Sequence, residues 1–221
     1  MALPLSGQIE NLLAALLLLL AFAMLAQRRV LTLIKLFAWQ GAALAVSTAI
    51  VAYATGQTHL YFSAGLTVAL KVVLIPWLLH RLIDQLQVRW DIETLLNIPT
   101  TMLAGIGLAI FAFSLATPIS QMASTITRST LGIALASVLL SFLMMIVRRK
   151  AVPQVIGFLS MENGLFFAAT SATYGMPLVV ELGVALDVLV GTFIFGIFFF
   201  HISATFESLD VEQMAHLKEN D

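Results

Sequence analysis

Residues 151–200 read AVPQVIGFLSMENGLFFAATSATYGMPLVVELGVALDVLVGTFIFGIFFF, and this stretch decides the fold. It consists of two apolar runs joined by a turn at residues 174–177, and each run is long enough to cross a lipid bilayer. Each run also carries a carboxylate well inside it, Glu162 in the first and Asp187 in the second. A carboxylate at bilayer depth is costly unless it is neutral, paired or hydrated. The two acids therefore need an explanation.

The composition is that of an integral membrane protein. Of the 221 residues, 60% are hydrophobic and only 10% are charged, whereas about a quarter of the residues of a soluble domain are charged. The chain has no cysteine, which excludes iron–sulfur clusters, thiolate metal sites and disulfides. If this protein works with electrons, the redox centres are therefore expected on other chains. Nothing in this chain is basic or aromatic enough to suggest nucleic acid.

Seven segments are long and apolar enough to span a bilayer, so we predict an all-α membrane protein with seven transmembrane helices. The segments are 6–27, 30–54, 58–80, 97–116, 126–147, 152–173 and 178–201. Lysine and arginine gather on one side of the predicted membrane, at Arg28, Arg29, Arg81, Arg89, Arg148, Arg149, Lys150 and Lys218. The other side has only Arg128. The asymmetry predicts the N-terminus outside and the C-terminus in the cytoplasm. We expect a multi-pass protein of the cell (inner) membrane.

Two segments are predicted to lie outside the bilayer. Residues 82–96 alternate polar and apolar side chains at helical spacing, which favours a short interfacial helix. Residues 202–221 are polar and acidic and form a predicted cytoplasmic tail. The tail is either partly ordered or docked on a partner through one apolar stripe.

The sequence contains an internal repeat. Residues 65–73, GLTVALKVV, align with residues 181–189, ELGVALDVL, so that Lys71 corresponds to Asp187. Spans one to three and five to seven are predicted to be two parallel copies of a three-helix unit, joined by span four. The predicted units are 1–83 (first copy), 84–125 (interfacial segment and connector), 126–201 (second copy) and 202–221 (tail).

Glu162 and Asp187 are the first candidates for chemistry. Asp187 lies one turn from both Gly183 and Gly191, on a face that another helix or water can approach closely. A proton-carrying site is favoured over a structural polar contact, because an intramembrane acid is usually functional. Glu162 is predicted to relay protons rather than to bind metal, since no histidine or second carboxylate lies three or four residues further on.

Lys71 is the third candidate, because Pro76 removes a helical hydrogen bond close to it. A buried lysine can lose and regain its proton, although it can also simply pair with a carboxylate of another helix. His80 and Glu181 are weaker candidates for proton transfer, near opposite ends of their spans. Glu10 and Lys35 lie close enough to helix ends to reach the interface.

The chain resembles the hydrogenase-4 component E family, membrane subunits of formate-hydrogenlyase-type complexes built on a group 4 [NiFe] hydrogenase. The resemblance covers essentially the whole chain. The sequences that carry it are TVALKVVLIP at 67–76, MENG at 161–164, VVELGVALDVLVG at 179–191 and SLDVEQMAHLK at 208–218.

The last three predicted spans also resemble the smallest antiporter-like subunit of respiratory complex I and the C subunit of multisubunit cation/proton antiporters. Asp187 matches the acid of the final helix in those proteins. Glu162 departs from the pattern, because it falls three residues later than the complex I acid when the preceding Ile156-Gly157 pair is aligned.

The resemblance implies a non-catalytic subunit of an oxidoreductase complex that transfers protons or charge along a membrane arm. The implied partners are antiporter-like and quinone-site-like membrane subunits and peripheral [NiFe] hydrogenase and iron–sulfur subunits. Redox chemistry would take place on those peripheral subunits, and this chain itself would bind no cofactor and no metal. Three alternatives remain open: a purely structural bridge between larger subunits, a subunit of a multisubunit antiporter or complex I-like enzyme, and, as the weakest, a metabolite transporter.

Overall fold

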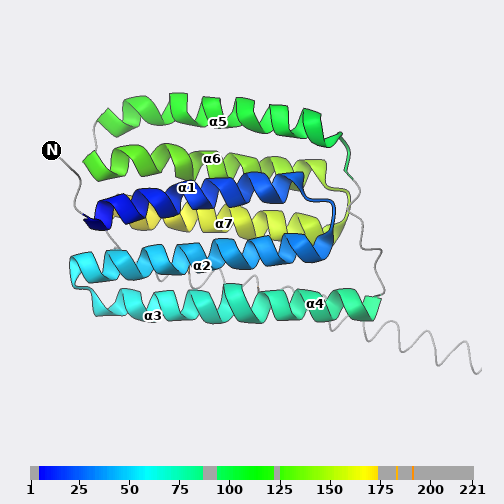
Figure 1. Ribbon diagram of the computed structural model, residues 1–221, viewed down its shortest axis with the longest axis horizontal. Helices are drawn as coiled ribbons and strands as arrows, with labels where there is room; N and C mark the ends of the chain where they lie inside the picture. Colours follow the sequence, from blue (N-terminus) through cyan, green and yellow to red (C-terminus); the bar gives the residue numbers. More distant parts are fainter. Residues whose placement is uncertain (1–4, 87–93, 122–124, 174–182, 184–190, 192–221) are drawn as a thin grey trace, which may run out of the picture. The chain divides into compact units, whose positions relative to one another are not determined.

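The computed structural model describes residues 5–86, 94–121 and 125–173, together with Gly183 and Gly191, and all of its regular elements are helices. The elements are α1 (Leu5–Ala26), α2 (Val30–Thr55), α3 (Thr58–Thr67), the π-helix η1 (Val68–Leu74), α4 (Ile75–Leu86), α5 (Ile98–Gln121), α6 (Thr125–Val147) and α7 (Ala151–Thr173) (Figure 1). Residues 1–184 form one compact unit and residues 185–221 a second.

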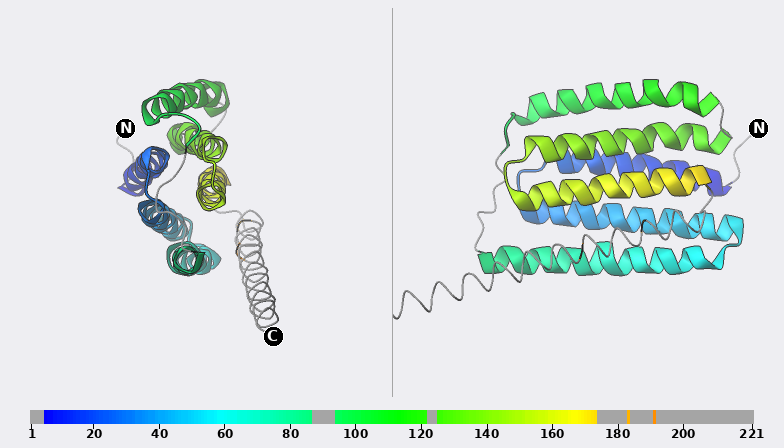
Figure 2. Two further views of the ribbon diagram at one scale, coloured as in Figure 1. Left: turned by 90° about the vertical axis from the view of Figure 1, so that its right-hand side faces the viewer. Right: turned by 180° about the vertical axis from the view of Figure 1, so that it is seen from behind.

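The helices of the first unit lie side by side in two layers. α1, α2 and the continuous rod made by α3, η1 and α4 form one layer, and α5, α6 and α7 form the other (Figure 2). Chain reversals join the helices at both ends. We name the two ends by a residue at each: the Gly56 end, with the α2–α3 turn, and the Arg148 end, with the α6–α7 turn.

Five segments of the described chain are long and apolar enough to cross a membrane. They are Gly7–Ala26, Val30–Thr55, Thr58–Arg81, Ile98–Pro118 and Thr130–Val147, which match the first five predicted spans. The sixth predicted span is α7. Its 23 residues are enough to cross a membrane, but its hydropathy is lower than that of the five segments above, because it carries Gln154, Glu162 and Asn163. The seventh span falls almost entirely outside the described residues, so the count of seven and the orientation stay predictions.

Charged residues set the two tight turns at the Arg148 end. α1 ends at Ala26 and α2 begins at Val30, with Gln27-Arg28-Arg29 between them, and Arg148-Arg149-Lys150 separates α6 from α7 in the same way. The predicted interfacial helix at 82–96 is different in the structure. Residues 82–86 continue α4, residues 94–96 are not helical, and residues 87–93 lie outside the described part.

Corresponding helices of the two predicted copies pack against one another, α1 on α6 and α2 on α7. Two parallel copies related by a two-fold axis would pack in this way. The third helix of the second copy is not described, so the repeat stays a prediction.

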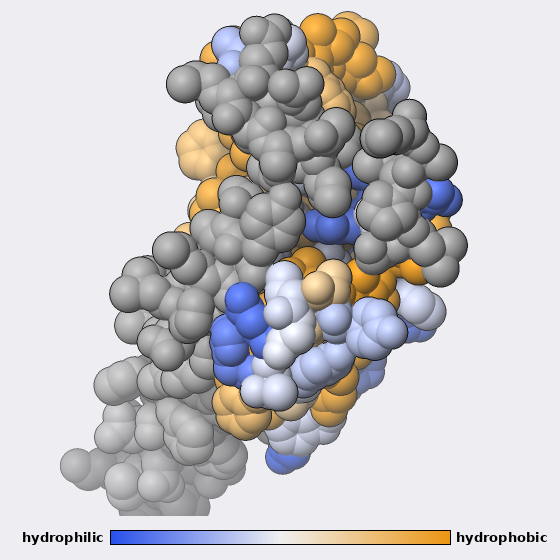
Figure 3. Space-filling view, turned by 90° about the vertical axis from the view of Figure 1, so that its left-hand side faces the viewer, coloured by the Kyte–Doolittle hydropathy of each residue, from blue (hydrophilic) through white to orange (hydrophobic). Residues whose placement is uncertain are grey.

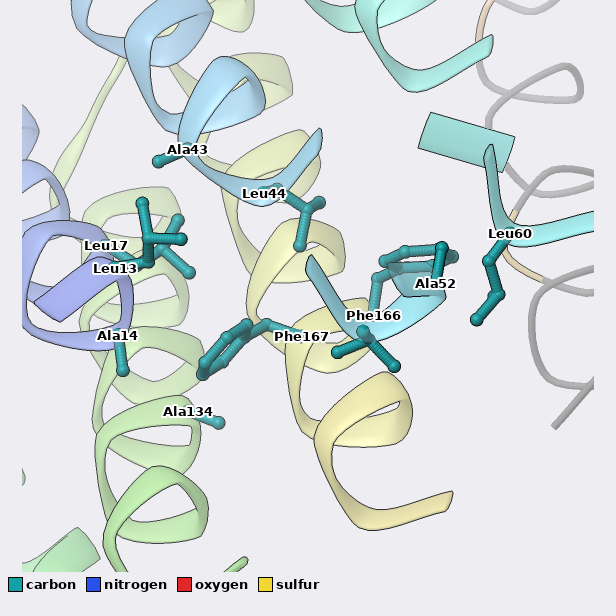
Figure 4. Packing of buried hydrophobic residues seen from close by; sticks show 11 residues of the cluster. Leu13, Ala14, Leu17, Ala43, Leu44, Ala52, Leu60, Ala134, Phe166 and Phe167 are labelled. Carbon is teal, nitrogen blue, oxygen red and sulfur yellow. The ribbon is translucent and has the colours of Figure 1, made fainter. Parts of the chain in front are cut away.

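One apolar cluster fills the space between the layers. Phe167 of α7 lies near Ala14 of α1 and Ala134 of α6, and Phe166 lies near Ala52 of α2 and Leu60 of α3 (Figure 4). Because adjacent helical residues point in different directions, α7 contributes to the packing on two sides. This position places its polar residues, one turn away, in the middle of the bundle.

Candidate functional site

The π-helix η1 places Lys71 in a locally widened turn. The N–H of Ile75 bonds to the carbonyl of Leu70, five residues back, in place of the usual four. Pro76 has no N–H, so it donates no hydrogen bond to the carbonyl of Val72. π-Helical turns of this kind occur frequently at functional sites.

Gly41 of α2 allows η1 to come close. A Cβ atom at position 41 would lie 3.0 Å from Cβ of Lys71, which is tighter than nearly all real contacts. The absence of a side chain at this position therefore lets the lysine stem pass α2 and enter the interior of the bundle.

Gly41→Val is expected to lower the free energy of unfolding by about 1–3 kcal/mol, because the added methyl groups must displace Lys71 or η1. The measurement is thermal unfolding of the detergent-solubilised protein. Gly65→Val is the matched control, since a Cβ at position 65 meets no atom within 4 Å. Equal destabilisation by the two substitutions would contradict a specific requirement for glycine at position 41.

Lys71 is at the centre of a buried polar cluster made by three helices. Its Nζ donates to Glu162 Oε1 at 3.1 Å and to Asn163 Oδ1 at 2.7 Å, both on α7. Asn163 Nδ2 in turn donates to Gln40 Oε1 of α2 at 3.1 Å. All four residues are at most 2% exposed. The cluster thus links η1, α7 and α2 through charged and amide groups only.

An aromatic ring borders the ion pair on the side of the Gly56 end. Nζ of Lys71 lies 5.9 Å from the centre of the Phe166 ring, a distance at which the ring attracts a cation. Phe166 follows Glu162 by one turn of α7 and therefore lies on the same face. Gly183 packs against this ring so closely that a Cβ atom there would collide with it.

A second buried polar contact joins α6 and α7. The hydroxyl groups of Ser141 and Ser160 are 2.7 Å apart, and Ser141 also donates to the carbonyl of Ser137 at 2.8 Å. Because these hydroxyls bond to each other and to a local carbonyl, they hold the two helices together.

Arg148 lies outside the spanning segments, directly after α6, and its guanidinium is buried. Nη2 donates to the carbonyls of Met24 at 3.1 Å and Leu25 at 2.9 Å, which belong to the last turn of α1. Nε and Nη1 have no hydrogen-bond partner within the described residues. Burial lowers the pKa of Arg148 to about 10, which still leaves it charged at neutral pH. The residue is a C-terminal cap for α1.

The structure brings together two of the predicted site residues, Lys71 and Glu162. His80 lies on an exposed part of α4, and Lys35 is exposed on α2. Asp187 and Glu181 fall outside the described residues, so their roles stay predictions. Among the described residues, no group of three histidine, cysteine or acidic side chains is placed to hold a metal ion.

Sequence reasoning missed Gln40 and the structural role of Arg148. A signal for Gln40 was present, because an amide in the middle of an apolar span usually has a partner inside the bundle. For Arg148 the only signal was its charge. That charge contributes to the predicted orientation, but it does not reveal that the side chain is buried.

The chain was compared with known proteins. It is 31% identical over 204 residues to the uncharacterized protein Rv0085 of Mycobacterium tuberculosis. The alignment covers 91% of this chain and 93% of that protein. No family model and no solved structure matches the chain. Because the alignment includes nearly all of both proteins, the chain belongs to the same family as the uncharacterized protein Rv0085.

Proposed function

We propose that this chain is a membrane subunit of a proton-translocating hydrogenase complex of the formate-hydrogenlyase type, in the cell (inner) membrane. It relays protons or charge through Lys71, Glu162 and Asp187. The single observation that carries the proposal is the buried Lys71–Glu162 ion pair with its amide partners Asn163 and Gln40. The hydrogenase context rests on the sequence resemblance alone.

The pair has two protonation states with the same number of protons. In one, an ammonium faces a carboxylate. In the other, a proton has moved from Nζ to Oε1, which leaves a neutral amine and a neutral acid. The two states have the same total charge, and they differ in where the charges lie. A charge that arrives nearby can therefore shift the proton, which is the elementary step of a relay.

In this proposal, the partner subunits supply the redox chemistry. Hydrogen or formate chemistry takes place on peripheral [NiFe] and iron–sulfur subunits, and its free energy drives the protonation changes in the membrane subunits. In this proposal, the chain contributes the buried charged side chains and their surroundings.

Glu162→Gln is expected to reduce proton uptake coupled to hydrogen evolution in inverted membrane vesicles by about 100-fold, the lower range for loss of an acid–base group. Glu10→Gln is the control, since it makes the same change near the end of α1. Full pumping by the double variant Glu162→Gln, Asp187→Asn would overturn the proposal and favour a purely structural bridge. Purification without nickel and iron–sulfur proteins would favour a stand-alone antiporter.

A further inference from the structure

Buried hydroxyl groups continue from the ion pair toward the Gly56 end. Ser63 and Thr67 precede Lys71 by two turns and one turn on the same helical rod, and both are at most 3% exposed. On α2, Ser47 and Thr48 are also buried, and they follow Gln40 in the direction of the Gly56 end. Ser63 and Thr67 belong to α3 and Ser47 and Thr48 to α2, and these two helices pack against each other. We call the region of α2 and α3 that carries these four buried hydroxyls the α2–α3 seam.

On α2 and α4, the buried residues in the opposite direction are apolar. Toward the Arg148 end, the buried residues of α2 are Val30, Leu33, Ile34 and Phe37. On α4, among the residues whose side chains the structure describes, they are Ile75, Leu78, Leu79 and Ile83. Each of them is at most 4% exposed. On the α2 and α4 sides, the cluster is therefore sealed at the Arg148 end and polar toward the Gly56 end.

Three polar atoms along this path have no hydrogen-bond partner within the part of the chain that the structure describes. They are Nε2 of Gln40, Oγ of Ser63 and Oε1 of Gln57, at the ion pair, in the seam and at the α2–α3 turn respectively. A buried polar atom without a partner costs about 1–3 kcal/mol. Water is the usual partner where the protein supplies none.

Apolar side chains close the seam at its outer part. Leu60 is fully buried and lies near Ala52 and Phe166 (Figure 4). Along the chain, Leu60 falls between the α2–α3 turn and Lys71. The Gly56 end has hydrophilic residues next to strongly hydrophobic ones (Figure 3), and Thr58 and His59 are exposed there. A short apolar constriction of this kind blocks water when it is dry and passes water when it wets.

We propose that water and protons reach the Lys71–Glu162 pair from the Gly56 end, along the α2–α3 seam, and that Leu60 and Phe166 form the constriction in this path. The path spans roughly 20 Å from the turn to Lys71, at about 1.5 Å per helical residue. Its hydration does not depend on the proposed function, but the passage of protons does. If the Gly56 end is outside, as predicted, the pair exchanges protons with the outside.

The chain has no cysteine, so single cysteines can be introduced without a background signal. A charged, membrane-impermeant methanethiosulfonate is added to intact cells that contain the whole complex. Thr67→Cys and Ser63→Cys are expected to react at least about tenfold faster than Leu78→Cys, the equally buried control on the apolar side. His59→Cys, which is exposed at the Gly56 end, reports that the reagent reaches that end.

Equal rates for Thr67→Cys and Leu78→Cys, or reaction from the opposite membrane face alone, would overturn the inference. Adding Phe166→Ala to Thr67→Cys should increase the labelling rate of the cysteine further. An unchanged labelling rate would show that Phe166 is not part of the constriction. If Thr67→Cys and Ser63→Cys prevent assembly of the complex, Ser47→Cys tests the same path from the side of α2. If the seam cysteines are labelled in a complex that does not pump protons, the hydrated path is supported and the proposed function is rejected.

Discussion

Lys71→Met is expected to destabilise the protein by about 3–5 kcal/mol. The double variant Lys71→Met, Glu162→Met should be only about 1–3 kcal/mol less stable than the original chain, the cost of leaving Asn163 Oδ1 without its donor. The single substitution leaves Glu162 buried without its cation. The double substitution removes both charges and replaces them with flexible apolar side chains that fit irregular spaces. Burying an ion pair costs about as much as the attraction returns, so losing the two charges together is by itself nearly neutral.

The measurement is thermal unfolding of the detergent-solubilised protein, with Lys35→Met as the matched control. Lys35 is exposed, so its loss should change stability by less than about 0.5 kcal/mol. If the proposed relay is right, the double variant should assemble but not pump, which separates stability from proton transfer. A double variant as unstable as the single one would mean that the pair is a net source of stability, and that expectation would be wrong.

Arg148→Ala is expected to destabilise the protein by about 2–4 kcal/mol, because it removes two hydrogen bonds from a charged donor and leaves the carbonyls of Met24 and Leu25 without their cap. Arg148→Lys should recover only part of this loss. Lysine keeps the charge, but it lacks the planar guanidinium that reaches two carbonyls from one nitrogen.

Arg149→Ala is the matched control for this prediction, because Arg149 is the next residue in the chain and is exposed. It should change the unfolding temperature little. Limited proteolysis offers a second measurement, since loss of the cap should loosen the turn between α1 and α2 before the rest of the bundle unfolds. Similar effects of the two alanine substitutions would show that charge at this end, rather than the cap, is what matters.

Helix positions could be predicted from the sequence where charges interrupt apolar runs. The first two spans were predicted at 6–27 and 30–54, and the helices occupy Leu5–Ala26 and Val30–Thr55. The prediction was less accurate after residue 80, where the helix continues to Leu86. The periodicity of residues 82–96 predicted a separate interfacial helix, but residues 82–86 continue α4. Periodicity indicates that an amphipathic segment is helical, but not whether it continues the preceding helix.

The components of the site could be predicted, but their arrangement could not. Lys71 and Glu162 attract attention because charges are rare at bilayer depth. Periodicity gives the direction of a side chain on its own helix, but not which of the other helices it meets. The partnership of Lys71 with Glu162 depends on η1, α2 and α7 packing together, and only the structure supplies that information.

The ion pair has a consequence for how the protein is made. Its two residues are 91 positions apart, so Lys71 leaves the ribosome well before Glu162 does. At about 5–20 residues per second, the lysine precedes its partner by roughly 5–20 s. During this interval, the segment that contains η1 must enter the membrane with its lysine neutral, at the interface, or held by another protein. The packing of Lys71 against α2 and α7 is therefore completed only after α7 has been inserted.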